Sequence, residues 1–177
     1  RWLYQNKKMF RQLKDFMEEI HATGAKLFVQ LTAGMGRAWG ISDEVLPIHK
    51  NPVLKVLAKP ILDTDYQLAS PSPLPSRWAE GVTCPEMTLA QIEEIIEAFA
   101  KTAALKEAGV DGVEVHAVHE GYLLDQFALK YTNHRTDNYG GSFENRYRFA
   151  VDIVKAIKGV CGQDYPVSIR YSAVSKV

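Results

Sequence analysis

Three times along the chain, a segment with the apolar spacing of an amphipathic helix is followed by a short apolar run suited to a buried strand. The helical patterns start at Asn6, Thr88 and Ser142, and the strand patterns cover residues 26–31, 112–116 and 166–171. Helices that alternate with strands in this order predict an α/β fold, in which the strands pair in parallel and the crossovers are right-handed.

Polar residues at the ends of the predicted strands favour one of the two architectures that this order allows. Gln30, His116 and Arg170 stand at or next to the carboxyl ends of the three runs. In a (β/α)8 barrel those ends surround one mouth, where the active sites of barrel enzymes lie. A doubly wound sheet also fits the order, but no glycine-rich phosphate loop follows any strand, which counts against a dinucleotide-binding domain. We therefore expect residues 1–177 to be part of a single (β/α)8 TIM barrel domain.

The charge balance and the cysteines argue against several classes of function. Twenty-one basic residues match 21 acidic ones, so no basic surplus indicates a nucleic-acid or membrane partner. No apolar run approaches the ~20 residues of a membrane span. Cys84 and Cys161 lie far apart without a Cys-x-x-Cys pattern, which indicates a reduced, cytoplasmic setting and no metal site. The chain begins at Arg1 without methionine, and we expect it to be an excerpt of a longer protein.

Two long segments between the predicted elements are rich in turn-forming residues. Residues 32–87 hold most of the prolines and show no sustained periodicity, and a connection of this length without regular structure is usually functional. Residues 132–146 are rich in residues that form turns and helix caps. Their expected role is to shape a loop and to start the third helix.

The stretch from Glu114 to Tyr122 carries the densest set of reactive side chains, with two imidazoles, two carboxylates and a phenol at a strand end. His116 and His119 can both donate hydrogen bonds to a carbonyl oxygen on which negative charge develops. Tyr122 can supply a proton to carbon as a general acid, and Glu120 can tune that proton or orient its neighbours. A single histidine near a strand end is more often structural, but this combination at a barrel mouth favours catalysis.

Other roles are open for the same residues. The His-x-x-His-Glu pattern can also bind a metal, but the other strand ends offer Gln and Arg rather than carboxylate or thiolate ligands, so we expect none. The amide of Gln30 suits the edge of a planar heterocycle such as a flavin pyrimidine ring, and Arg170 would stabilise an anionic reduced flavin. A purely structural role for Gln30 and Arg170 is an equal alternative.

Three blocks follow one another in the second half of the chain. They are residues 111–116 (Asp-Gly-Val-Glu-Val-His), 121–127 (Gly-Tyr-Leu-Leu-Asp-Gln-Phe) and 132–149, which includes Arg-Thr-Asp-Asn-Tyr-Gly-Gly-Ser-Phe-Glu-Asn-Arg. Together they resemble the signature region of the Old Yellow Enzyme family, and residues 28–31 and 166–172 are similar to strands that flank it. The sequence around Glu120 looks most like the 2-enoate reductase and 2,4-dienoyl-CoA reductase branch.

This resemblance implies a flavin-binding (β/α)8 barrel, of which the chain covers roughly strands three to five. Gln30 and Arg170 match the positions that hold the flavin pyrimidine edge. His116 and His119 look like the pair that binds the substrate carbonyl or carboxylate, with the division of labour between them open. Tyr122 matches the tyrosine that protonates the α-carbon, assisted by Glu120.

The function implied by the resemblance is an FMN-dependent ene-reductase. Such an enzyme transfers hydride from NADH or NADPH, through the flavin, to the C=C bond of an α,β-unsaturated acid, thioester or ketone. Kinship with this branch also implies a 4Fe-4S cluster and FAD in parts outside this chain, and a homo-oligomer is compatible with the sequence. The alternatives are a metal-dependent TIM-barrel hydrolase that uses His116, His119 and Glu120, and a barrel without catalytic activity.

Overall fold

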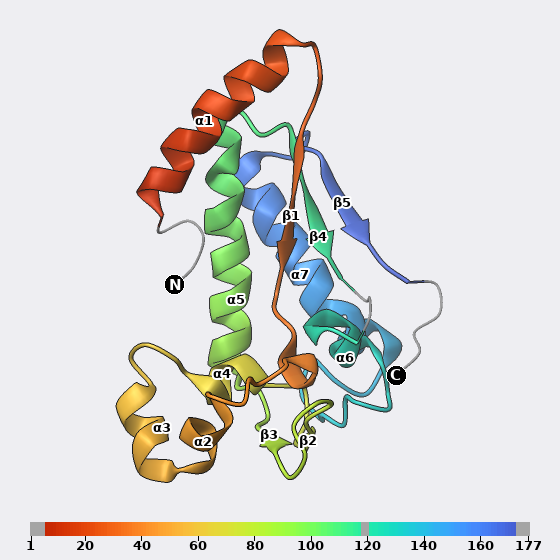
Figure 1. Cartoon of the computed structure of the whole chain (residues 1–177). Helices are drawn as coiled ribbons and strands as arrows, with labels where there is room; N and C mark the ends of the chain where they lie inside the picture. Colours follow the sequence, from red (N-terminus) through yellow and green to blue (C-terminus); the bar gives the residue numbers. More distant parts are fainter. Residues whose placement is uncertain (1–5, 118–120, 173–177) are drawn as a thin grey trace. The chain divides into compact units, whose positions relative to one another are not determined.

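A computed structural model of the chain describes residues 6–117 and 121–172, which fall into two compact units (Figure 1). The first unit is drawn from residues 1–32, 89–117 and 149–171, and it holds the main sheet. The second is drawn from residues 33–88, 118–148 and 172–177, and it holds the long connections between the strands.

Three parallel strands form the sheet of the first unit, in the order β1-β4-β5 (Figure 1). Their bounds are Phe28–Thr32 for β1, Gly112–His116 for β4 and Val167–Arg170 for β5. The predicted strands and their parallel pairing are confirmed, with end shifts of at most two residues. Since β4 lies between the other two, its side chains have neighbours on both sides.

Gly112, at the start of β4, is paired with Phe28 at the start of β1. A Cβ atom added at Gly112 would lie 2.5 Å from the ring of Phe28, which is closer than van der Waals contact allows. The absence of a side chain therefore lets the aromatic ring lie across the first residue of the central strand.

Helices precede each strand in the first unit, as the apolar spacing predicts. They are α1 (Lys7–Ala22), α5 (Leu89–Thr102) with the 3-10 helix η3 (Ala103–Ala108), and α7 (Phe143–Cys161), of which residues 149–161 belong to this unit. Asn6 caps α1, because its side chain accepts a hydrogen bond of 3.0 Å from the backbone of Met9. Gly109 ends η3 with a left-handed φ of 92°, a conformation that glycine adopts without strain.

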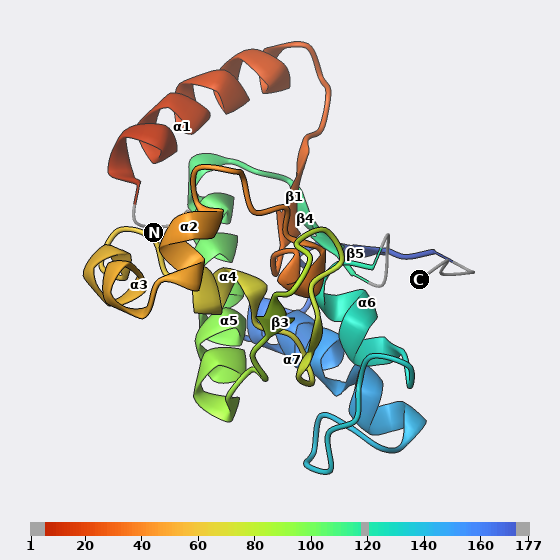
Figure 2. The same cartoon turned by 60° about the horizontal axis from the view of Figure 1, so that its bottom comes forward.

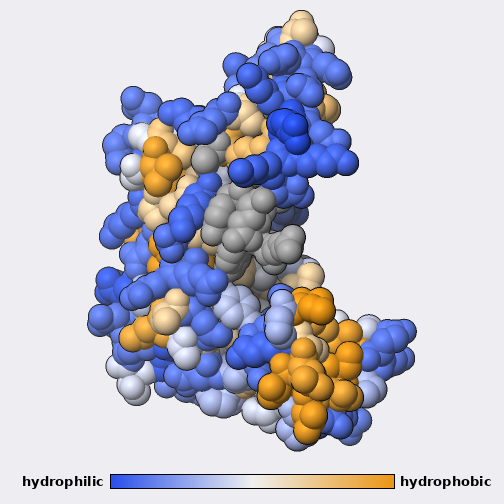
Figure 3. Space-filling view, turned by 90° about the vertical axis from the view of Figure 1, so that its left-hand side faces the viewer, coloured by the Kyte–Doolittle hydropathy of each residue, from blue (hydrophilic) through white to orange (hydrophobic). Residues whose placement is uncertain are grey.

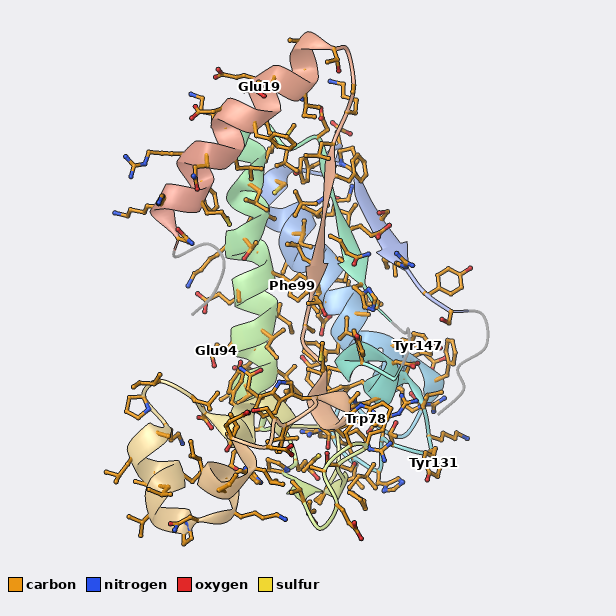
Figure 4. All side chains as sticks on the ribbon, viewed as in Figure 1. Glu19, Trp78, Glu94, Phe99, Tyr131 and Tyr147 are labelled. Carbon is orange, nitrogen blue, oxygen red and sulfur yellow. The ribbon has the colours of Figure 1, made fainter. Side chains whose placement is uncertain are left out.

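The core of the first unit lies between the helices and the apolar face of the sheet. Val113 and Val115 of β4 are fully buried, and Phe99 of α5 points to the same side (Figure 4). Glu94, nearly one and a half turns earlier on α5, points away from the sheet. The buried residues of α5 and α7 include Ile92, Ile95, Phe149, Ile153 and Ile157. Each fully buried side chain of this kind contributes roughly 1.5–3 kcal/mol relative to an exposed one.

The second unit corrects one expectation, because residues 32–87 are not without regular structure (Figure 2). The segment forms η2 (Gly36–Ala38), α2 (Leu46–Lys50), α3 (Pro52–Ala58), α4 (Thr64–Leu68) and a hairpin of β2 (Leu74–Pro75) with β3 (Thr83–Cys84). These helices are too short to produce a periodic apolar pattern, and side-chain caps start two of them, α3 and α4. The side chain of Asn51 accepts hydrogen bonds from Val53 and Leu54 at the start of α3.

The loop of residues 132–146 has the structural role that its composition predicts. Asn133 is buried, and its amide donates hydrogen bonds of 2.7 Å to the carbonyl oxygens of Phe127 and Tyr139. At the end of the loop, the hydroxyl of Ser142 accepts from the backbone of Asn145 at 3.2 Å and caps α7.

The outer face of α3 and the turn after it are apolar. Val53, Val56, Leu57 and Ile61 are each 65–95% exposed, and an apolar patch is visible in the space-filling view (Figure 3). Among the helices that the structure describes, none combines the length and the apolar character needed to cross a membrane.

Candidate active site

Two rows of polar side chains cross the sheet of the first unit near the carboxyl ends of its strands. The register places Thr32, His116 and Arg170 side by side, and we call these three the tip row. Two residues earlier on each strand, Gln30, Glu114 and Ser168 form the second row. Because side chains alternate between the faces of a strand, all six share one face of the sheet.

The alternation in the sequence decides which face carries these rows. Leu31, Val113 and Val115 stand between the polar positions and are buried on the opposite face, under the helices. Their burial leaves the polar residues on the side opposite the helices of the first unit, where Gln30 and Arg170 are exposed and His116 is half-buried. In a closed (β/α)8 barrel this side is the interior.

The structure refines the prediction that three strand ends carry Gln30, His116 and Arg170. His116 and Arg170 are direct neighbours in the register, as expected. Gln30 lies one row lower, because β1 extends two residues beyond it, and Thr32 occupies the position level with His116. The sequence assigned no role to Thr32, and it showed Glu114 only as one carboxylate of a reactive stretch, since neither pairing can be read without the register.

Gln30 has a specific partner in the second row. Its amide nitrogen Nε2 donates a hydrogen bond of 2.5 Å to Oε1 of Glu114, the residue opposite it on β4. The carboxylate can only accept, so this bond determines which end of the Gln30 amide faces β4.

Tyr122 belongs to the second unit, where it stands directly before α6 (Leu123–Ala128). Gly121 adopts a left-handed φ of 72° and places Tyr122 in an extended conformation. Two buried side chains fix this turn: the carboxylate of Asp125 accepts from the backbone of Gly121 at 2.8 Å, and the amide of Gln126 donates to the Gly121 carbonyl at 2.6 Å.

Gln126 also binds the segment that follows β1. Its amide donates to the carbonyl of Met35 at 2.8 Å and accepts from the backbone of Arg37 at 3.2 Å. Leu123 donates in addition to the carbonyl of Gly34 at 3.1 Å. The Tyr122 turn is therefore fixed to residues 34–37, and Asp125 and Gln126 are positioning residues that spacing alone did not reveal.

Two predicted site residues, His119 and Glu120, lie outside the described residues. Within residues 6–117 and 121–172, no three His, Cys, Asp or Glu side chains come close enough together to hold a metal ion. A cavity of about 380 Å³ opens beside the amino end of β5, lined by residues such as Lys106, Tyr165 and Pro166. This cavity lies at the end of the strand opposite Arg170, so it is not part of the candidate site.

Comparison with known proteins identifies the family to which this arrangement belongs. The model of the NADH:flavin oxidoreductase / NADH oxidase family matches residues 3–177. The chain belongs to this family. Membership confirms the resemblance drawn from residues 111–149.

Several members of the flavin oxidoreductase family are similar to the chain. Cinnamate reductase from Clostridium sporogenes is 48% identical over 162 residues, covering 91% of this chain and 21% of the relative. NADH oxidase from Thermoanaerobacter brockii is 38% identical over 161 residues, covering 90% and 21%. The chain therefore spans about a fifth of the length of these relatives.

A solved structure confirms the fold class. Old Yellow Enzyme from Pichia sp. AKU4542 matches with a TM-score of 0.71 at 32% identity, covering 94% of this chain and 40% of that one. That structure is a TIM barrel, and the chain forms a portion of the same fold.

The residues of the two rows fit the flavin that family membership implies. The pyrimidine edge of a flavin carries both an N–H group and carbonyl oxygens, so it needs acceptors and donors together. The Gln30 amide offers both, and the Arg170 guanidinium adds donors and a positive charge. Both side chains are exposed on the same face of the sheet.

Proposed function

We propose that the chain forms the flavin- and substrate-facing part of an FMN-dependent ene-reductase. When bound, FMN supplies hydride transfer from NADH or NADPH to the β-carbon of an α,β-unsaturated acid, thioester or ketone. The observation that carries this proposal is the pair of polar rows near the carboxyl ends of the strands, on the face of the sheet opposite the helices of the first unit.

Gln30 and Arg170 would hold the pyrimidine edge of the flavin. The amide of Gln30 matches its donor and acceptor atoms, and the positive charge of Arg170 stabilises the negative charge that reduction places on the ring. Arg170 lies beside His116 in the tip row, so the cofactor contact and the first substrate contact come from adjacent strands.

His116 and His119 would donate hydrogen bonds to the oxygen that activates the alkene. These donors stabilise the negative charge that develops on the oxygen as hydride reaches the β-carbon. They lower the activation barrier most where that charge is greatest. Tyr122 would protonate the α-carbon, assisted by Glu120. The buried hydrogen bonds of Asp125 and Gln126 support this role, because they fix the backbone that presents the phenol.

Similarity to cinnamate reductase favours an unsaturated carboxylic acid as the substrate. Cinnamate is such an acid, with a C=C bond next to the carboxylate. A 4Fe-4S cluster and FAD in parts outside this chain, a homo-oligomeric assembly and a cytoplasmic location belong to the same proposal.

The proposal is tested by visible absorption of the full-length protein before and after anaerobic addition of NADH. We expect flavin bands that bleach with NADH and return when cinnamate is added. A protein that stays colourless and cannot be reconstituted with FMN would contradict the proposal.

Replacing Tyr122 with Phe tests the assignment of the proton donor. We expect reduction of the alkene to slow about a hundredfold, because general acids contribute at least that much, while flavin reduction by NADH is unchanged. Stopped-flow absorption measures the two half-reactions separately. Tyr131→Phe is the matched control, since Tyr131 is an exposed tyrosine of the same unit. Equal slowing of both half-reactions in Tyr122→Phe would reject the role of Tyr122.

A further inference from the structure

A hydrogen bond to Glu114 on the neighbouring strand holds the Gln30 amide. Gln30 is exposed, so packing does not select between the two orientations of its amide, which differ by a half-turn. The bond of 2.5 Å from Nε2 to the Glu114 carboxylate makes that selection, because a carboxylate oxygen accepts and never donates.

Glu114 is itself well placed to direct its neighbour. It lies on the central strand, directly opposite Gln30 on one side and Ser168 on the other. Val113 and Val115, before and after it, are fully buried on the opposite face, so the backbone fixes the direction of the Glu114 side chain.

We propose that Glu114 is a positioning residue that orients the Gln30 amide toward the pyrimidine edge of the flavin. This inference rests on the proposed function. With Nε2 turned to Glu114, Gln30 keeps its Oε1 acceptor and its second N–H donor for a ligand. An imide edge, with an N–H beside a carbonyl oxygen, is complementary to that pair.

Without the carboxylate, the amide samples both orientations. One of them places its donor against a donor of the ligand and its acceptor against an acceptor. Binding must then select one orientation and order the side chain, which weakens affinity. Hydrogen bonds to charged groups are stronger than neutral ones, so the expected loss of FMN affinity is about tenfold.

The test is a double-mutant cycle in the full-length protein. FMN is removed, and its dissociation constant is measured by the quenching of flavin fluorescence in wild type, Glu114→Gln, Gln30→Ala and the double variant. We expect Glu114→Gln and Gln30→Ala each to weaken binding about tenfold. We expect the double variant to bind as Gln30→Ala does, because Glu114 acts only through the amide.

Matched variants separate this role from a structural one. Glu93→Gln makes the same chemical change at an exposed position of α5, outside the two rows, and is expected to leave FMN affinity unchanged. Circular dichroism checks that each variant is folded. If Glu114→Gln does not fold, Glu114→Asp replaces it: its shorter side chain withdraws the acceptor, and the same coupling with Gln30→Ala is expected.

The outcomes distinguish a failure of this inference from a failure of the proposed function on which it rests. Wild-type affinity in a folded Glu114→Gln variant, or losses that multiply in the double variant, would overturn the role of Glu114 and leave the ene-reductase proposal standing. A wild-type protein that binds no FMN would overturn both.

Discussion

At the scale of single residues, Gln126 is the side chain on which the Tyr122 turn most depends. It is fully buried, and its amide nitrogen donates to the carbonyl oxygens of Gly121 and Met35. Gln126→Glu keeps the shape but turns a carboxylate oxygen toward these two acceptors. We expect the free energy of unfolding to fall by about 3 kcal/mol, because two buried carbonyls lose their donor. Urea unfolding measures the change.

The matched control for this variant is Gln12→Glu, at an exposed position on α1. Its effect is expected to stay within about 0.5 kcal/mol, as for other surface substitutions. Equal stability of the two variants would show that the amide of Gln126 does not fix the turn.

The two cysteines of the chain are expected to be unreactive in the folded protein. Burial raises the pKa of the Cys84 thiol to about 11, and burial also raises the pKa of Cys161. The reactive thiolate is therefore scarce at neutral pH, and both sulfur atoms are buried. We expect a thiol reagent followed by peptide mass spectrometry to find both residues unmodified, and fully modified after unfolding in guanidinium. Rapid labelling of Cys84 under native conditions would contradict this.

The sequence predicted site residues that stand at the end of a single strand. It did not predict those whose role depends on contact with a distant segment of the chain. His116 and Arg170 stand at strand ends in the sequence, and the register makes them neighbours. The role of Gln126 depends on the approach of residues 34–37, about 90 positions earlier, which no local pattern reveals. The pairing of Gln30 with Glu114 likewise follows only from the register.

At the scale of elements, Asp111 joins the amino ends of β1 and β4. Its carboxylate accepts from the backbone of Leu27 and from His21, each at 2.9 Å, and pairs with Lys26 at 3.0 Å. The hydrogen bond from Leu27 is the main reason that the pKa of Asp111 lies well below its ordinary value, with His21 adding to the effect.

This lowered pKa makes the stability of the junction depend on pH. Because the pKa is lower in the folded chain, the stabilisation is present above the ordinary aspartate pKa of about 3.9 and is lost as the pH falls further. We expect Asp111→Asn to be less stable than wild type near neutral pH, with the difference shrinking toward about pH 3. Urea unfolding across this range measures it.

Asp15→Asn, at an exposed aspartate of α1, is the control for this series, and we expect it to match wild type near neutral pH. A gap between Asp111→Asn and wild type that stays constant down to about pH 3 would show that the charge of Asp111 does not stabilise the junction.

Elements were predictable when they were long enough to repeat their pattern. The sixteen residues of α1 repeat their apolar spacing several times, and the prediction agrees with the structure. The five residues of α2 and the seven of α3 complete too few turns for such a signal. The pair Asn51-Pro52 is the signal that could have revealed α3, because it combines a cap residue with proline at the first helical position.

At the scale of the whole molecule, alternation and motif order predicted the barrel class, but nothing in the sequence showed how the long connections hold together. In the second unit, the buried guanidinium of Arg135 connects several of these segments. The Arg135 guanidinium donates to the carbonyls of Pro71 and Met87, at 3.2 and 2.6 Å, and pairs with Asp137 at 2.6 Å. The pKa of Asp137 is lowered, mainly by this hydrogen bond from Arg135.

Arg135→Lys tests whether this arrangement needs the guanidinium or only its charge. A guanidinium offers five N–H donors in a planar fork, whereas one ammonium group cannot reach two carbonyls and a carboxylate in the same positions. The side chain of Arg135 is only 3% exposed, so water does not replace the lost donors. We expect the free energy of unfolding to fall by about 3 kcal/mol, measured by urea unfolding.

Arg11→Lys supplies the comparison for this prediction, because Arg11 lies on the exposed side of α1 and the substitution is chemically identical. It is expected to change stability by less than about 0.5 kcal/mol. If Arg135→Lys were equally mild, charge alone would suffice to hold the loops, and the fork of hydrogen bonds would not be their organising contact. A large loss confined to Arg135→Lys would instead explain why a loop of turn-forming residues keeps one conformation. The hydrogen bonds of a buried guanidinium fix its backbone, and lysine cannot replace them.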